Sequence, residues 1–274
     1  DLEINSVKCK KQEHHIDVFA IVNEEYALII EDKTNTSEHG NQLKRYSEWV
    51  KGKEQYSELD LHCIYYKTGN ESYAKLKRLE ENYTKEYPEE NFSIITREDV
   101  LSVLKQSTTT NAIFCDYVEH LQKIQDLTDS YLSLPIQKWS WEAWQGFYMA
   151  LEKELHTGDW GYVATPSGGF LGFWWHWNSI ASNTDVDIYL QLEEKKLCVK
   201  SYQKGGVEKG YIYSSQLIEL AKEKNISLVK PDRLRKGTTM TLAVHILPDT
   251  ANLPDIVQLL REIENFLDEA SQYL

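Results

Sequence analysis

Two short apolar runs separated by a polar break stand out near the start of the hydrophobic pattern. Residues 16–22 read IDVFAIV, residues 26–30 read YALII, and the polar residues 23–25 lie between them. Aromatic and β-branched residues favour strands, and a break of three polar residues is typical of a tight turn. The pattern therefore predicts a β-hairpin.

The predicted hairpin brings two acidic residues together. If it is symmetric about its middle residue, Val22 lies opposite Tyr26 and Asp17 lies opposite Glu31. Directly opposed side chains have Cβ atoms about 5 Å apart, and two like charges there destabilise the sheet. Lys33 shares a face with Glu31 because side chains alternate along a strand, so it offsets one charge. A divalent cation such as Mg²⁺, which prefers oxygen ligands, would offset the other.

Strands and helices follow one another along the rest of the N-terminal pattern. We predict strands over residues 2–7, 59–66 and 92–96, and helices over residues 41–51, 72–87 and 97–105. The polar residues 8–15 are expected to form a turn or a wide hairpin connection, and the polar residues 34–40 a loop at the rim of the hairpin site. Gln42 and Tyr46 are four residues apart and therefore share one helix face.

These features resemble the PD-(D/E)XK nuclease superfamily. Asp17, followed one strand later by Glu-Asp-Lys at residues 31–33, is similar to the D…(D/E)xK core of that superfamily. Gln42 and Tyr46 are similar to the QxxxY element of its RecB-type members. The resemblance implies an α/β (α+β) class and a restriction-endonuclease-like mixed sheet flanked by helices. It also implies a helix before the first strand, which we expect to precede Asp1.

The resemblance also assigns roles to residues. It implies a set of catalytic residues formed by Asp17, Glu31, Lys33, Gln42 and Tyr46. It implies a site for Mg²⁺, or Mn²⁺, formed by Asp17, Glu31 and the backbone carbonyl group of Asp32. An alternative from the residues alone is that these polar side chains are only the solvated ends of buried strands, although this does not explain why two acids fall opposite one another.

The pattern changes character after a polar stretch that ends near residue 110. We predict helices over residues 114–124, 141–155, 215–224 and 256–267, hairpins over residues 160–177 and 187–202, and a strand over residues 240–247. The chain is therefore divided into a nuclease-like domain, residues 1–106, and an α+β accessory domain, residues 107–274. In the first of these hairpins, Phe173, Trp174 and Trp175 are expected either to pack in the core or to stack on unpaired bases.

The net charge of the chain, −13, is unfavourable for binding nucleic acid. An acidic protein repels nucleic acid at long range, whereas binding to phosphates depends on Lys and Arg. Local basic clusters must therefore provide the contacts. We predict nucleic-acid binding by Lys44 and Arg45 after the candidate site, and by Arg233, Arg235 and Lys236 in the densest basic stretch.

The spacing of the cysteines and the hydropathy of the chain indicate where in the cell we expect the protein to be located. The four cysteines are isolated from one another and show no metal-binding spacing, which favours a reducing, cytoplasmic location. No apolar run approaches the roughly 20 residues that a membrane span needs, so we expect no membrane partner. A protein partner or a homo-oligomer stays open.

The function predicted from the sequence is metal-dependent hydrolysis of phosphodiester bonds in nucleic acid, with DNA favoured over RNA, in bacterial or phage DNA processing or defence. Two alternatives stay open. One is a nuclease-like module that is catalytically weak or inactive and serves as a binding scaffold for a protein partner. The other is a nuclease directed at RNA, because nothing in the motif separates the two polymers.

Overall fold

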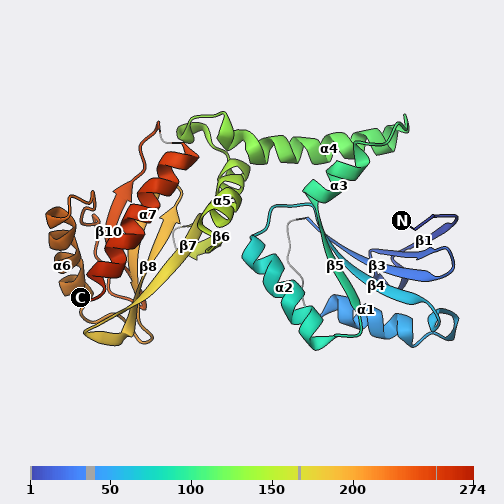
Figure 1. The fold of residues 1–274 in the computed structure, drawn as a ribbon, viewed down its shortest axis with the longest axis horizontal. Coiled ribbons are helices and arrows are strands. Elements are labelled where there is room, and N and C mark those ends of the chain that lie inside the picture. The colour runs from blue at the N-terminus through green and yellow to red at the C-terminus, as the bar shows by residue number, and fades with distance from the viewer. Residues whose placement is uncertain (1, 35–40, 166–167, 251) are drawn as a thin grey trace. The chain divides into compact units, whose positions relative to one another are not determined.

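The computed structural model describes residues 2–34, 41–165, 168–250 and 252–274 and divides into two compact units (Figure 1). The first unit comprises Asp1–Glu71 and Lys75–Leu127, and the second comprises Ser72–Ala74 and Thr128–Leu274. The domain boundary at residues 106 and 107 stays a prediction. Of the predicted rim loop over residues 34–40, only Thr34 is among the described residues.

A mixed five-stranded sheet forms the centre of the first unit, in the order β1-β2-β3-β4-β5. Its strands are β1 (Val7–Lys11), β2 (Val18–Val22), β3 (Tyr26–Lys33), β4 (Asp60–Lys67) and β5 (Asn91–Thr96). The first three strands pair antiparallel, and β4 pairs in parallel with both β3 and β5. The helices of this part of the chain are α1 (Gln42–Lys51), α2 (Tyr73–Glu86), α3 (Arg97–Leu104) and α4 (Ala112–Asp129). The predicted fold class is confirmed.

The hairpin between β2 and β3 has the register that its symmetry predicts. Val22 pairs with Tyr26, and the pairing continues step by step to Val18 and Ile30. Asn23 adopts a left-handed conformation with φ 53°, which Asn tolerates better than most residues. Its side-chain oxygen also accepts hydrogen bonds from two backbone N–H groups of the segment before β1. The turn chemistry therefore supports the register.

The first strand was predicted wrongly. A strand was expected over residues 2–7 and a turn or wide hairpin connection over residues 8–15. Instead, β1 runs from Val7 to Lys11 and pairs antiparallel with β2, so that only residues 12–17 connect the two strands. Every side chain of β1 is exposed, so this edge strand carries no hydrophobic pattern that could reveal it. Its position depends on backbone hydrogen bonds to β2, which the sequence does not display.

Helix α1 packs its apolar face against the sheet. The core of this unit includes the fully buried residues Phe19, Ile29, Leu43, Val50 and Cys63. Along β3, Ala27, Ile29 and Glu31 alternate with less buried residues, so Glu31 continues the buried face of the strand. The carboxylate of Glu31 therefore occupies a buried position of β3 at which the alternation predicts an apolar side chain.

The second unit is built on an antiparallel sheet in the order β10-β9-β8-β7-β6 (Figure 1). Its strands are β6 (Asp159–Thr165), β7 (Gly168–Ile180), β8 (Asn183–Glu193), β9 (Lys196–Tyr202) and β10 (Thr239–Ile246). Its helices are α5 (Trp141–Leu155), α6 (Gly210–Glu223) and α7 (Leu253–Ala270). These three helices and the sheet share one hydrophobic core. None of the described helices combines the length and the apolar character that a membrane span requires.

The aromatic strand β7 belongs mainly to this core. Phe173 is 0% exposed and Trp175 is 1% exposed, so neither ring is available for stacking on bases. The indole N–H group of Trp175 donates to the Glu264 carboxylate at 2.5 Å, which satisfies its buried polar atom. The expectation of core packing is therefore correct for these two residues.

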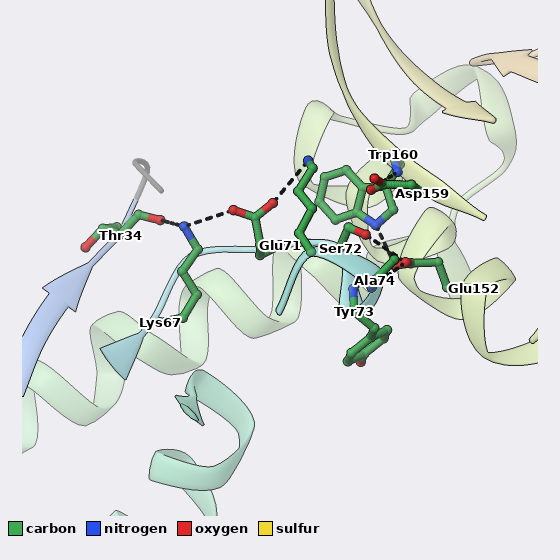
Figure 2. A network of polar contacts seen from close by, with 10 residues as sticks. Thr34, Lys67, Glu71, Ser72, Tyr73, Ala74, Glu152, Asp159 and Trp160 are labelled. Carbon is green, nitrogen blue, oxygen red and sulfur yellow. Dashed lines mark hydrogen bonds and ion pairs between the residues drawn. The ribbon is translucent and has the colours of Figure 1, made fainter. Parts of the chain in front are cut away.

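A buried carboxylate on α5 collects four hydrogen bonds within the second unit (Figure 2). Glu152 accepts from the Ser72 hydroxyl at 2.8 Å, from the backbone N–H groups of Tyr73 and Ala74 at 3.1 Å each, and from the Trp160 indole at 2.9 Å. Burial raises the pKa of Glu152, and these donors oppose that rise because they favour the ionised form.

Replacing Glu152 by Gln keeps the shape but turns one acceptor oxygen into an NH₂ group that faces N–H donors. We expect the free energy of unfolding to fall by about 2 kcal/mol, because buried donors lose their acceptor. Urea unfolding of the full chain measures this change. Glu154→Gln, at an exposed position of the same helix, is the control and should leave stability within about 0.5 kcal/mol. Equal stability of both variants would contradict the assignment.

Candidate active site in the first unit

Asp17 lies directly before β2, one step beyond the pairing of Val18 with Ile30. Its Oδ2 atom accepts a hydrogen bond from the backbone N–H group of Asp32 at 2.9 Å. This bond holds the Asp17 carboxylate against the end of β3, beside Glu31. The register of the hairpin thus brings the two predicted acids to the same place.

Glu31 is 1% exposed, which is unusual for an acidic side chain. Its Oε1 atom accepts a hydrogen bond from Lys33 Nζ at 2.6 Å. Its Oε2 atom is buried and has no hydrogen-bond partner among the described residues. Burial raises the pKa of Glu31, the Asp17 carboxylate adds to the rise, and Lys33 opposes it. The site therefore contains a buried oxygen that lacks a donor.

Lys33 links the strand to the helix that follows it. Besides the Glu31 carboxylate, its Nζ atom donates to the side-chain oxygen of Gln42 at 2.9 Å. Gln42 is the first residue of α1, which packs on the buried face of the sheet. The ammonium group is consequently held between two oxygen atoms from two different elements, and three predicted site residues come together here.

Tyr46 shares the buried side of α1 but contacts a different group. Its side chain is 5% exposed, and its hydroxyl donates to the backbone carbonyl of His15 at 2.9 Å. His15 lies two residues before Asp17, so this bond fixes the chain that leads into β2. The hydroxyl of Tyr46 therefore supports the position of Asp17, while Gln42 contacts Lys33.

Asp32 has its side chain on the other face of β3, because side chains alternate. That side chain is exposed, and its pKa is raised by partial loss of hydration and by the nearby Asp17. Its register neighbour on β4 is Tyr66, whose hydroxyl lies 2.5 Å from the Tyr117 hydroxyl. Only the backbone carbonyl group of Asp32 was predicted as a metal ligand, and this prediction does not require its side chain.

A second lysine beside the site was not predicted. Lys67 ends β4, pairs with Lys33 in the parallel register and is 3% exposed. Its Nζ atom donates to the Thr34 carbonyl at 3.0 Å and lies 3.7 Å from the Glu71 carboxylate (Figure 2). Burial lowers its pKa, and Lys33 contributes to the decrease. The sequence shows only a lysine after an apolar run, so the sole available signal was its place at the strand end.

The predicted basic residues fall in both units. In the first unit, Lys44 is half-buried, lies 3.6 Å from the Glu86 carboxylate and is 5.1 Å from the centre of the Tyr87 ring. Arg45 is exposed on the same helix. In the second unit, three exposed side chains occupy the irregular segment before β10, namely Arg233, Arg235 and Lys236.

The donor set fits a hard divalent cation. Among the described residues, no group of three or more His, Cys, Asp or Glu side chains could hold a metal ion. Mg²⁺ does not require such a group, because it keeps several waters and often binds through one or two carboxylates. Asp17 and the unpartnered Oε2 atom of Glu31 supply two adjacent carboxylates, and a cation would remove their repulsion.

Comparison with known proteins agrees with this geometry. A family model described as the PD-(D/E)XK nuclease superfamily matches residues 2–133, which include the hairpin, α1 and the helices up to α4. No curated protein and no solved structure gives a significant match. Residues 2–133 thus match the PD-(D/E)XK nuclease superfamily, which confirms the resemblance drawn from Asp17, residues 31–33, Gln42 and Tyr46.

The raised pKa of Glu31 predicts how cation binding depends on pH. In the absence of a cation, the native protein binds more protons at this group than the unfolded chain does above pH 4.5, so its contribution to stability falls as pH rises. A cation needs the ionised carboxylate. We therefore expect the Mg²⁺-induced increase in melting temperature to grow as the pH rises above 4.5, where the ionised form of Glu31 becomes more populated.

Thermal unfolding of Glu31→Gln and Glu24→Gln provides the comparison. Glu24 lies at the exposed turn of the same hairpin and should keep the effect of Mg²⁺, whereas Glu31→Gln should lose it. An equal response of the two variants to Mg²⁺ would contradict cation binding at Glu31.

Proposed function

We propose that this protein is a metal-dependent nuclease that hydrolyses phosphodiester bonds of DNA. The observation that carries the proposal is the buried, unpartnered Oε2 atom of Glu31 beside the Asp17 carboxylate, with the Lys33 ammonium bonded to the same Glu31. An acid pair that costs stability and has no role in the core is best explained as a cation site. The match of residues 2–133 to a nuclease superfamily supports the same reaction class.

Asp17, Glu31 and the backbone carbonyl of Asp32 would hold Mg²⁺ or Mn²⁺. When bound, the cation would supply a water of lowered pKa and would withdraw charge from the phosphate oxygens. Lys33 would donate a hydrogen bond to the attacking water or to a phosphate oxygen as negative charge develops. Because its ammonium group is already held by Glu31 and Gln42, little reorganisation is needed at that step.

The surrounding residues would keep this arrangement in place. Gln42 fixes Lys33 from the start of α1, and it could exchange this contact for one with the phosphate. Tyr46, a predicted catalytic residue, would act by holding the segment before Asp17 through the His15 carbonyl. Lys44 and Arg45 would bind the phosphate backbone beside the site. In so acidic a protein these contacts must work against long-range repulsion, so binding should be strongly sensitive to salt.

The four cysteines are free thiols, which is compatible with a reducing cytoplasm. The superfamily resemblance supports DNA processing or defence in a bacterial or phage context as the setting. The preference for DNA over RNA rests on that resemblance as well. The assay that follows therefore includes both polymers.

Purified full-length protein should cleave DNA in the presence of Mg²⁺ or Mn²⁺ and should be inactive in EDTA. We expect Asp17→Asn and Lys33→Ala to lower the cleavage rate by roughly 100-fold or more. The first removes a carboxylate that would hold the cation, and the second removes the ammonium group that would contact the reacting phosphate. Cleavage of labelled single-stranded and duplex DNA, and of RNA of the same sequence, measures this. Glu24→Gln, which alters a carboxylate at the far end of the same hairpin, should keep full activity.

Full cleavage by either site variant would refute the assignment of the residues. Cation binding at Glu31 without cleavage of any polymer would instead favour the binding-scaffold alternative. Faster cleavage of RNA than of DNA would show that RNA, and not DNA, is the preferred substrate.

A further inference from the structure

Two neighbouring loops of the second unit form a basic surface, whereas the predicted catalytic residues belong to the first unit. They comprise residues 203–209, between β9 and α6, and residues 230–238, before β10. The Gln203 N–H group donates to the Thr238 carbonyl, and the Val207 N–H group donates to the Gly237 carbonyl, at 2.9 Å each. These two backbone hydrogen bonds join the loops, which we call the paired loops.

The paired loops concentrate positive charge in a protein of net charge −13. They contain six exposed basic residues, namely Lys204, Lys209, Lys230, Arg233, Arg235 and Lys236. No salt bridge joins any of the six to a carboxylate among the described residues, although many other lysines of the chain have such a partner. The loops contain two acidic residues, Glu208 and Asp232, so their net formal charge is +4.

Exposed aromatic rings border the paired loops. Tyr202 ends β9 directly before the first loop and is 39% exposed, and Tyr211 follows that loop and is 44% exposed. The Lys236 ammonium lies 5.7 Å from the centre of the Tyr211 ring. Trp177, which is 49% exposed, packs edge-on against Tyr202 with ring centres 6.4 Å apart and stacks on Tyr189 at 3.9 Å. Exposed aromatic side chains therefore lie both beside the paired loops and on the neighbouring strands of the sheet.

We propose that the paired loops and the flanking rings of Tyr202, Tyr211 and Trp177 bind single-stranded nucleic acid, at a surface separate from the candidate active site. The identity of the ligand rests on the proposed nuclease function. The six basic groups match a phosphate backbone, whose binding releases counterions. The exposed rings match unpaired bases, because stacking on aromatic side chains is the usual mode of single-strand binding. In a duplex the faces of the bases are stacked on one another, so a duplex would contact the basic side chains through its phosphates but would not stack on the exposed rings.

Several features of the surface favour this ligand over an acidic protein. The basic side chains are spread over two loops that backbone hydrogen bonds hold together, which suits an extended chain with regularly spaced charges. The first turn of α6, next to Lys209, contains no acidic residue that would lower the local positive potential. The nearest cross-strand carboxylate, Asp187 opposite Tyr202, already accepts a hydrogen bond from Ser179.

The test uses the full chain in EDTA, so that binding is measured without cleavage. The probe is fluorescein-labelled single-stranded DNA of about 20 nucleotides, and fluorescence anisotropy gives the Kd at several salt concentrations. We expect the double variant Arg233→Ala/Arg235→Ala to bind roughly tenfold more weakly, and the slope of log affinity against log salt to decrease by about 1.4. Lys138→Ala/Lys222→Ala removes two exposed lysines of the same unit outside the loops and should match the wild type.

The aromatic contribution is tested separately. Tyr202→Ala should weaken binding several-fold, while Tyr202→Phe, which keeps the ring, should retain it. The melting temperature of each variant shows whether it is folded. The same measurement with the matching duplex should give weaker binding than the single strand.

Unchanged affinity and salt slope in the Arg233→Ala/Arg235→Ala variant would overturn the proposal, as would duplex binding as tight as single-strand binding. A parallel cleavage assay in Mg²⁺ separates this proposal from the nuclease function. Cleavage without any dependence of binding on the loops would overturn only the binding surface. Loop-dependent binding without cleavage would support the surface and overturn only the nuclease.

Discussion

The pairing of β2 with β3 is the interaction on which the candidate site depends. This register sets Asp17 beside the end of β3, where it accepts a hydrogen bond from Asp32, and it places Glu31 on the buried face under α1. Burial of a carboxylate is costly unless its oxygens find partners, and among the described residues only one oxygen of Glu31 has a hydrogen-bond partner. The packing of α1 holds this arrangement in place. Gln42 accepts a hydrogen bond from Lys33, and Tyr46 donates one to the backbone carbonyl of His15, before Asp17.

Three of the buried charged side chains in the described part of the chain differ in how their charge is compensated. Glu152 is fully satisfied by four donors and therefore serves structure. Lys67 finds the Thr34 carbonyl and the Glu71 carboxylate at the end of β4. Glu31 differs from both because an oxygen atom is left over and a second carboxylate lies next to it. This contrast, within one protein, separates a carboxylate that stabilises the fold from one that, in the proposed function, would bind a cation.

In the proposed function, the distribution of charge would give the two units one substrate class. The whole chain is acidic, yet the basic residues of the paired loops have no acidic partners among the described residues. A nuclease with a negative overall charge gains from a local surface that attracts the polymer, because Coulomb attraction over a few ångströms outweighs a screened repulsion from distant groups. In this proposal the second unit would supply affinity, while the first unit would supply the reaction.

The sequence by itself determined the hairpin and its register from Val22–Tyr26 to Val18–Ile30, and it predicted that Asp17 lies near Glu31, because local turn chemistry and alternation of side chains fix them. It also gave most helices and strands, whose hydrophobic periods are clear. It missed β1, since an exposed edge strand has no such period, and it missed Lys67, which resembles any lysine at a strand end. Only the tertiary structure decided that Gln42 meets Lys33 while Tyr46 meets His15, and that two basic loops adjoin. Each of these contacts joins residues from different elements. The local hydrophobic pattern of one element does not show which side chains of another element will lie beside it.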